Sequence, residues 1–321
     1  MKNKKKGLLS RITSSRVFRV MFARKTIVVC TILILVMILL AIFAPVVTKY
    51  DPNKDDLYNV LQGCSAEHWL GTDANGRDVL TRIIYGGRIS FTVGLVAVCI
   101  SSVIGMALGL IAGVVGGMVD TVIMRIMDAM MAVPMLILAL FLGAILGQGL
   151  FNVCLALGIS MVPSYARITR GQVLSVRNAD YVTAGTLSGA SGVRNTLVHV
   201  FPNCLSANIV TMTGSLGGAI LAEANLSFLG MGIAPPTASW GAMVSGGYKC
   251  LSTQPIVAIA PGIAIIIVVL CFNMVGDALR DALDPKLRGT LGKARKHGKK
   301  GAQPAAASEQ GAQAQKEGAV K

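Results

Sequence analysis

Six stretches of apolar residues, separated by polar segments, limit what this chain can fold into more than any other feature. A helix needs about 20 predominantly apolar residues to cross a hydrocarbon core about 30 Å thick. The stretches that meet or approach this length are 26–47, 90–115, 129–146, 150–163, 204–229 and 255–276. Because backbone groups in lipid must be hydrogen-bonded internally, the expected fold is an all-α polytopic membrane protein with six transmembrane helices.

Composition and charge exclude two other classes and set the orientation. A soluble protein with these stretches as core helices would need a large polar surface, yet only 14% of the residues are charged and 53% are hydrophobic. The net charge is +15, and residues 1–25 hold nine Lys and Arg with no acid. This asymmetry predicts a cytoplasmic N-terminus, and six spans return the C-terminus to the same side. No nucleic-acid partner is expected, because no soluble domain carries the charge.

The expected organisation follows from the spans and from the polar segments between them. Residues 8–21, within the basic segment, form either an interfacial helix on the inner leaflet or an unstructured leader. The expected parts are a basic cytoplasmic segment (1–25), a first transmembrane helix (26–47), an extracytoplasmic loop (48–89), a five-helix core (90–276) containing a polar loop (164–203), a cytoplasmic exit helix with a basic segment (277–297) and a disordered tail (298–321).

Small residues and a proline mark how the helices are expected to pack. Glycines recur every fourth residue at 105, 109, 113 and 117, a spacing that lets a second helix approach closely in lipid. Close packing is one interpretation of this row, and a pore-lining face is the other. Pro134 is expected to kink the third span, since proline removes a backbone hydrogen bond.

Nucleotide, metal and catalytic sites are not expected in this chain. Gly292-Lys293 lacks the glycine five positions earlier that a phosphate-binding loop requires. The seven cysteines have no metal-ligand spacing, and three histidines (68, 199 and 297) cannot form a catalytic set. Cys64 and Cys250 both fall in expected extracytoplasmic loops, which leaves two states open for them: a disulfide that ties the loops together, or two free thiols.

The first loop contains a specific block, His68-Trp69-Leu70-Gly71-Thr72-Asp73-Ala74-Asn75-Gly76-Arg77-Asp78. Asn75-Gly76 predicts a tight turn, with Asp73 and Asp78 accepting hydrogen bonds from turn amides or from Arg77. A calcium loop is disfavoured, because the alternating oxygen ligands and the closing glutamate are missing. The block resembles one in the C-type permeases of dipeptide, oligopeptide and nickel ABC importers. Ser239-Trp240-Gly241 continues the same resemblance.

Residues 180–203 resemble the coupling loop of such permeases. Ala184, Gly189 and Pro202 keep the family spacing, whereas Thr183 stands where glutamate is usual and Gly185 where a second alanine is usual. We expect a helix over 164–184, an interruption at Gly189, and a second helix over 193–200. The resemblance implies a knob that docks in a cleft of an ATPase subunit. Its expected contact residues are Tyr181, Ala184, Gly189, His199, Pro202 and Asn203.

Glu223 is the only acid placed well inside an expected span, and it opens a block, Glu-Ala-Asn-Leu-Ser-Phe-Leu-Gly, that also resembles the family. Buried carboxylates usually face a cavity or a partner. Two roles are open: contact with the substrate pathway, or a structural tie to the following loop through backbone amides.

The resemblance implies a type I permease fold with cytoplasmic coupling helices, in the bacterial inner membrane among lipid. Such a chain forms half of a pathway for peptides or a related solute (a nickel chelate or an opine). Its implied partners are a B-type permease homologue, two ATPase subunits that bind ATP and Mg, and an extracytoplasmic binding protein. No cofactor is implied in this chain. The alternative is an ion-coupled secondary transporter or channel, for which several intramembrane ionisable residues and an inverted repeat would be expected.

Overall fold

The computed structural model describes residues 24–283. The expected N-terminal leader, the tail from residue 298 and most of the 277–297 segment therefore lie outside the described residues. Helices make up most of the described chain. They are α3 (Lys25–Ile42), α4 (Ala44–Val47), α5 (Val79–Val115), α6 (Gly117–Ala132), α7 (Met135–Leu146), α8 (Leu150–Val176), α9 (Asp180–Leu187), α10 (Gly192–Asn195), the π-helix η1 (Thr196–Val200), α11 (Phe201–Phe228), α12 (Trp240–Tyr248) and α13 (Ile256–Leu283).

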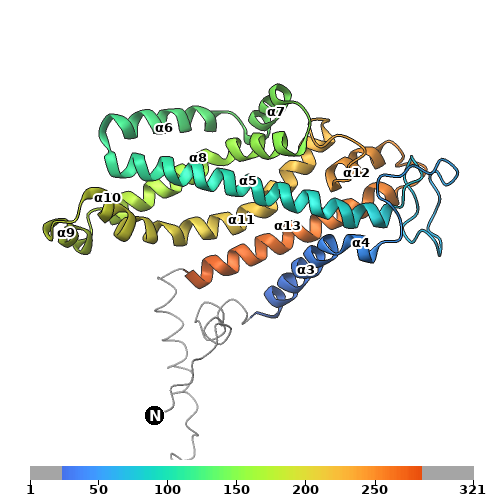
Figure 1. Cartoon of the computed structure of the whole chain (residues 1–321), viewed down its shortest axis with the longest axis horizontal. Coiled ribbons are helices and arrows are strands. Elements are labelled where there is room, and N and C mark those ends of the chain that lie inside the picture. Colours follow the sequence, from blue (N-terminus) through green and yellow to red (C-terminus); the bar gives the residue numbers. More distant parts are fainter. Residues whose placement is uncertain (1–23, 284–321) are drawn as a thin grey trace, which may run out of the picture. The chain divides into compact units, whose positions relative to one another are not determined.

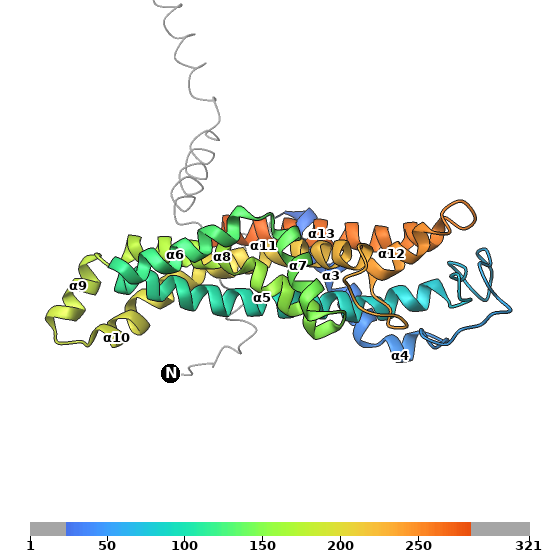
Figure 2. The same cartoon turned by 90° about the horizontal axis from the view of Figure 1, so that it is seen from above.

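The helices confirm the all-α membrane fold. Among the described residues, five helices are long and apolar enough to span a membrane, and the bent pair α6–α7 would make a sixth. The long helices α5, α8, α11 and α13 run along one another, with α9 and α10 at one end and loop 48–78 at the other (Figures 1 and 2). The 68–78 block and the 180–203 loop of the sequence thus lie at opposite ends of the bundle.

The first span is broken, not continuous over 26–47 as expected. α3 ends at Ile42 and α4 begins at Ala44. Pro45 has no amide to donate to the carbonyl of Ala41, so a regular helix cannot continue there. Arg88 of α5 satisfies the freed groups: its Nε donates to Ala41 O at 2.7 Å and its Nη2 to Ile42 O at 2.8 Å.

α5 begins eleven residues before the expected start at residue 90, so part of the predicted loop is helical. Asp78 caps it by accepting a hydrogen bond from the Thr81 amide at 2.8 Å. With 37 residues, α5 is about 55 Å long, much longer than a hydrocarbon core.

The third span consists of two helices, where the sequence predicted one over 129–146. α6 and α7 meet at 93° around Pro134, so the predicted kink is confirmed but is far sharper than a bend within one helix. Two ion pairs join α6 to α8. Arg170 holds both carboxylate oxygens of Asp120 at 2.5 and 2.6 Å, and Arg167 lies 2.6 Å from Asp128.

The fourth span was predicted to end at Pro163, but the helix continues beyond it. α8 continues to Val176 with Pro163 inside it, which neighbouring helices allow in membrane proteins. The expected 164–184 helix is therefore split between α8 and α9. α11 and α13 match their expected spans within a few residues at their starts, and α13 continues to Leu283. The short helix α12 was not predicted.

The glycine row packs α5 against α8, which favours the packing interpretation. A Cβ at Gly105 would lie 2.5 Å from Tyr165 Cβ, and one at Gly113 would lie 2.7 Å from Val173 Cβ. Gly117 does not belong to the row, because α5 ends before it and Gly117 begins α6, with nothing within 4 Å of the corresponding Cβ.

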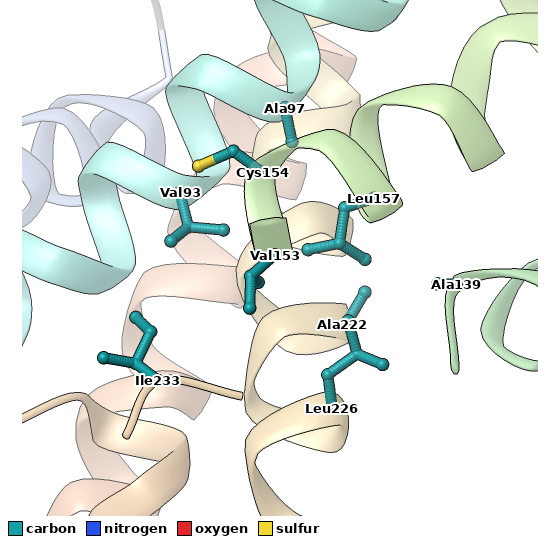
Figure 3. Close-up of a cluster of buried hydrophobic side chains, with 9 residues drawn as sticks. All are labelled: Val93, Ala97, Ala139, Val153, Cys154, Leu157, Ala222, Leu226 and Ile233. Atoms are coloured by element: carbon teal, nitrogen blue, oxygen red, sulfur yellow. The ribbon is translucent and has the colours of Figure 1, made fainter. Parts of the chain in front are cut away.

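A buried cluster fixes the centre of the bundle (Figure 3). Side chains from α5, α7, α8 and α11 meet there, together with Ile233 from the loop after α11. The members are Val93, Ala97, Ala139, Val153, Cys154, Leu157, Ala222, Leu226 and Ile233. Through this cluster, α7 packs on α8 despite the sharp bend that precedes it.

Candidate functional site

Residues 177–200, which we call the knob, link α8 to α11 and end in a tight turn. α9 closes with two backbone bonds: Gly189 N donates to Thr186 O at 3.0 Å and Ala190 N to Gly185 O at 3.1 Å. This is the Schellman pattern, which places a left-handed residue just after the helix. Gly189 takes that position with φ +81°. The predicted interruption at Gly189 is therefore a defined helix cap.

Asn195 holds the two sides of the knob together, and the sequence interpretation missed it. Its Nδ2 donates to Val182 O and to Thr186 Oγ1, both at 2.9 Å, and the residue is buried. Gly185 faces it, where a Cβ would lie 2.8 Å from Asn195 Oδ1. This contact gives a physical reason for glycine where the family pattern has alanine.

Three of the expected contact residues lie together on one side of the knob. Asn203 Nδ2 donates to His199 O at 2.7 Å and to the Tyr181 hydroxyl at 3.3 Å. The Tyr181 and His199 rings are 6.5 Å apart in an edge-on arrangement. Ala184 and Gly189 are exposed, and Pro202 lies in the first turn of α11.

The base of the knob is fixed to both long helices. Val173 of α8, Val182 of α9, Val200 of η1 and Cys204 of α11 form one buried cluster. Beneath it, the fully buried Thr169 hydroxyl donates to Asn208 Oδ1 at 3.1 Å, bonding α8 to α11. A displacement of the knob would therefore be transmitted to both helices.

The knob exposes four large apolar side chains among its polar ones. Leu187 is 85% exposed and Val193 is 72% exposed. Leu197 and Val198 are also more than half exposed. Large exposed apolar side chains gathered on a small element indicate a contact surface.

The loop block folds around Asp73, much as predicted. Asp73 Oδ1 accepts from the Asn75 and Arg77 amides at 2.8 and 2.9 Å, and Gly76 has φ +73°. The Arg77 side chain lies 2.6 Å from Asp55 Oδ1, and this hydrogen bond lowers the pKa of the Asp55 carboxyl. Sequence spacing gave no sign of the Asp55 partner, which is 22 residues away.

Asp78 links the loop to α5 through a buried pair. Besides capping the helix, its Oδ1 lies 2.9 Å from His68 Nδ1, and both side chains are buried. The loop backbone passes close to Gly71, where a Cβ would overlap the Gln62 carbonyl. We find a structural role for each of these block residues.

Trp240, the first residue of α12, joins that helix to the N-terminal part of α5. Its Nε1 donates to Ile83 O at 2.8 Å, and its ring is buried with an edge-on contact to Phe91 at 5.4 Å. Side chains at Gly86 and Gly87 would lie 3.2 Å from the indole ring. These two glycines therefore leave the space that Trp240 fills.

Glu223 is completely buried between α11, α5 and α12. Ser90 Oγ donates to one carboxylate oxygen at 3.1 Å and Ser227 Oγ to the other at 2.8 Å. The Trp240 amide lies 3.4 Å from Ser90 Oγ. The carboxylate is thus bonded by serine hydroxyls, whereas the structural hypothesis expected backbone amides. Ser90 nevertheless connects Glu223 to the segment after α11, because its hydroxyl also accepts from the Trp240 amide.

Of the two states left open for Cys64 and Cys250, the structure has free thiols. Cys64 and Cys250 are both free thiols, Cys64 exposed and Cys250 partly buried. The two loops are instead joined by Gln254 Nε2, which donates to Gln62 O at 2.9 Å. No group of three His, Cys, Asp or Glu side chains with metal-binding geometry is present in residues 24–283.

Comparison with known proteins assigns the chain to a family. Residues 105–289 match the family described as "binding-protein-dependent transport system inner membrane component". The chain belongs to this permease family. Residues 14–63 of the permease also match the N-terminal transmembrane domain of oligopeptide transport permease C. The permease is therefore a C-type subunit of an ABC importer and a multi-pass membrane protein, and the ion-coupled alternative is set aside.

Several curated relatives match most of the permease. A dipeptide transport system permease protein of Alkalihalophilus pseudofirmus is 43% identical over 84% of this chain and 89% of its own length. A di/tripeptide transport system permease protein of Pseudomonas aeruginosa is 44% identical, covering 79% and 86%. A glutathione transport system permease protein of Escherichia coli is 40% identical, covering 80% and 85%.

Two substitutions separate the roles open for Glu223 in the permease. Glu223→Gln keeps the size and one acceptor oxygen, and serine hydroxyls can also accept from the new amide, so we expect near-normal protein yield and transport. Glu223→Ala leaves buried hydroxyls unpaired and a cavity, at a cost of about 1–3 kcal/mol, so yield should fall. Detergent-extracted yield and substrate uptake are the measurements. Loss of uptake in a stable Glu223→Gln complex would instead assign this carboxylate to the pathway.

Proposed function

We propose that this permease imports dipeptides or similar short peptides as half of a heterodimeric pathway. The other half is a B-type permease homologue. Two ATPase subunits, which bind ATP and Mg, act from the cytoplasm, and an extracytoplasmic binding protein delivers the substrate. The printed names of the relatives support the substrate class, since these relatives transport dipeptides, tripeptides or glutathione.

The observation that carries the proposal is the knob at the end of the bundle opposite loop 48–78 (Figure 1). The basic 1–25 segment supports a cytoplasmic N-terminus in the bacterial inner membrane, and an even number of spans returns the C-terminus to that side. Counted from a cytoplasmic N-terminus with α6–α7 as one span, the spans support a cytoplasmic knob and an extracytoplasmic loop 48–78. The permease thus offers one face to ATPase subunits and the other to a binding protein.

In this mechanism ATP-driven closure of the ATPase subunits displaces the knob. The Val173–Val182–Val200–Cys204 cluster and the Thr169–Asn208 bond transmit that displacement to α8 and α11. These helices also contribute to the central cluster with α5, so the three helices move together. The pathway then opens toward the outside, where the binding protein releases its peptide.

Reconstitution tests this function. Proteoliposomes that contain the permease, its B-type homologue and both ATPase subunits should take up a radiolabelled dipeptide. The binding protein is supplied on the opposite side of the membrane from the ATPase subunits, and ATP on the same side as these subunits. Omission of the binding protein should abolish uptake. Uptake of other solutes but of no peptide by the complete complex would contradict the proposed substrate.

The permease by itself should hydrolyse no ATP. The phosphate-binding loop that hydrolysis needs is not found in its sequence, so phosphate release from highly purified permease should equal the protein-free background. A matched preparation with ATPase subunits added should hydrolyse ATP. ATP hydrolysis by the purified permease alone that persists after contaminating ATPases are removed would contradict the assignment of hydrolysis to separate subunits.

A further inference from the structure

We propose that Cys30, Cys271 and Met274 form a binding site for a soft monovalent cation of the Cu(I) class. The three sulfur atoms come from α3 and α13, the first and the last of the described helices that are long enough to span a membrane. None of the three residues lies in the knob or in the central cluster. The site is therefore independent of the peptide-import function proposed above.

The three sulfur-bearing side chains meet where α3 packs on α13 (Figure 1). Cys30 Sγ lies 3.5 Å from Met274 Sδ. Cys271 shares a buried cluster with Cys30 and interacts with its thiol. Cys271 and Met274 are three residues apart on α13, so their side chains are neighbours on one face of that helix. The three sulfurs therefore lie together.

Two thiols and a thioether are a soft ligand set, which suits Cu(I) better than hard cations. In a three-coordinate complex with metal–sulfur bonds of about 2.3 Å, the sulfurs lie about 4 Å apart. The 3.5 Å between Cys30 and Met274 is close to that spacing, and the unbranched methionine side chain can adjust to an ion. Zn(II) fits less well, because structural zinc sites take four ligands from Cys, His, Asp and Glu, and residues 24–283 hold no group of three such side chains.

The charge balance favours a monovalent ion. Cys30 and Cys271 are buried among apolar side chains, where an uncompensated charge is costly. Cu(I) replaces the proton of one thiol: the S–H bond breaks, a copper–sulfur bond forms, and the proton leaves to water. The site thus has the same net charge with the ion as without it, and the exchange needs no oxidant or reductant.

An ion can reach the site from the end of the bundle where α3 begins. Arg24, just before α3, lies 3.7 Å from Asp281 near the end of α13, and both side chains are exposed. Cys30 is only about 9 Å along the helix from Arg24. Met274 is 40% exposed, whereas both cysteines are buried. The thioether is therefore the first ligand that an entering ion would meet.

Sequence spacing could not indicate this site, because its ligands lie on the first and last spans. A buried cysteine alone usually behaves as a small apolar side chain. Cys204 is such a case, since the described residues of its cluster include no second sulfur. Cys30 differs because two further sulfurs lie beside its thiol.

The test measures Cu(I) binding to the full-length permease, purified in detergent with a thiol-free reductant, by competition with a chromophoric Cu(I) chelator. The parent should bind one more Cu(I) than Cys30→Ser or Cys271→Ser, which put a hard oxygen in place of sulfur. Met274→Leu keeps the apolar volume and should weaken binding of that ion by about tenfold or more. Cys204→Ser, the matched buried control, should bind Cu(I) as the parent does.

A second measurement follows from the position of the ligands on two helices. Bound Cu(I) ties α3 to α13, so it should raise the unfolding temperature of the parent but not that of Cys30→Ser. Equal stoichiometry and affinity in the parent and in a monodisperse Cys30→Ser would overturn the site. If Cys30→Ser does not fold, parent-like affinity in Met274→Leu would overturn the three-sulfur site instead. An equal loss of binding in Cys204→Ser would overturn it too, because the effect would then not belong to these three residues.

Discussion

Gly109→Leu should leave almost no folded permease in the membrane. A Cβ at Gly109 would overlap the Ala166 carbonyl oxygen and lie 2.8 Å from Thr169 Cβ and 3.0 Å from Arg170 N. Most of these neighbours are backbone atoms of α8, which cannot rotate away as a side chain can. α5 and α8 would have to separate, and both the glycine row and the adjacent Thr169–Asn208 bond would be disturbed. The measurement is the yield of monodisperse protein after detergent extraction and gel filtration.

Gly171→Ala is the control, since this glycine lies on α8, the helix that Gly109 packs against, but nothing lies within 4 Å of the corresponding Cβ. It should accumulate normally, and a gain in helix propensity could even raise its yield. Normal yield and uptake by Gly109→Leu would show that α5 and α8 do not pack as described.

Gly189→Val should uncouple ATP hydrolysis from transport while leaving the permease folded. No atom lies within 4 Å of a Cβ at this position, so the effect comes from the backbone alone. The left-handed conformation costs an L-residue about 1–2 kcal/mol, and a β-branched residue tolerates it especially poorly. The turn between Leu187 and Val193 would change shape, so uptake should fall by about tenfold while ATPase activity stays within about twofold. Uptake and phosphate release are measured in the same proteoliposomes.

Gly189→Asn provides the control at the same position, because asparagine adopts the left-handed conformation far more readily. It adds a larger polar group than valine's methyls without the backbone conflict, so coupling should be retained. Equal loss of coupling in both variants would place the effect in contact with the partner, and full coupling in Gly189→Val would remove the turn from the mechanism.

Hydropathy located the spans but not their ends. The start of α5 was missed because residues 79–89 include Arg82 and Arg88, which look like loop residues. In the structure Arg88 bonds two carbonyls freed by the α3–α4 break, and Arg82 donates to the Pro52 carbonyl. Helix is thus stabilised there by contacts between distant segments. The end of the fourth span was misplaced for the same reason: proline is usually taken as a helix end from sequence alone, but neighbouring helices allow Pro163 inside α8.

In the candidate site, too, the sequence predicted some features and missed others. Gly189 and the Asn75-Gly76 turn were predicted because glycine at such positions has a local, conformational meaning. Asn195 and the Thr169–Asn208 bond were not, because an amide in a polar segment and a threonine in a helix carry no sign of their distant partners. The disulfide hypothesis lacked support for a related reason: two cysteines in polar loops carry no sign of the distance between them, and both are free thiols in the structure.

α5 runs from the Asp78 cap in loop 48–78 to Gly113, whose carbonyl accepts from Arg177 at the edge of the knob at 3.0 Å. A stiff rod about 55 Å long that tilts by about 10° around its middle moves its two tips about 5 Å in opposite directions. Such a lever would widen one face of the membrane pathway as it narrows the other. Energy delivered on the ATPase side could then reach the binding-protein side without any helix melting or sliding.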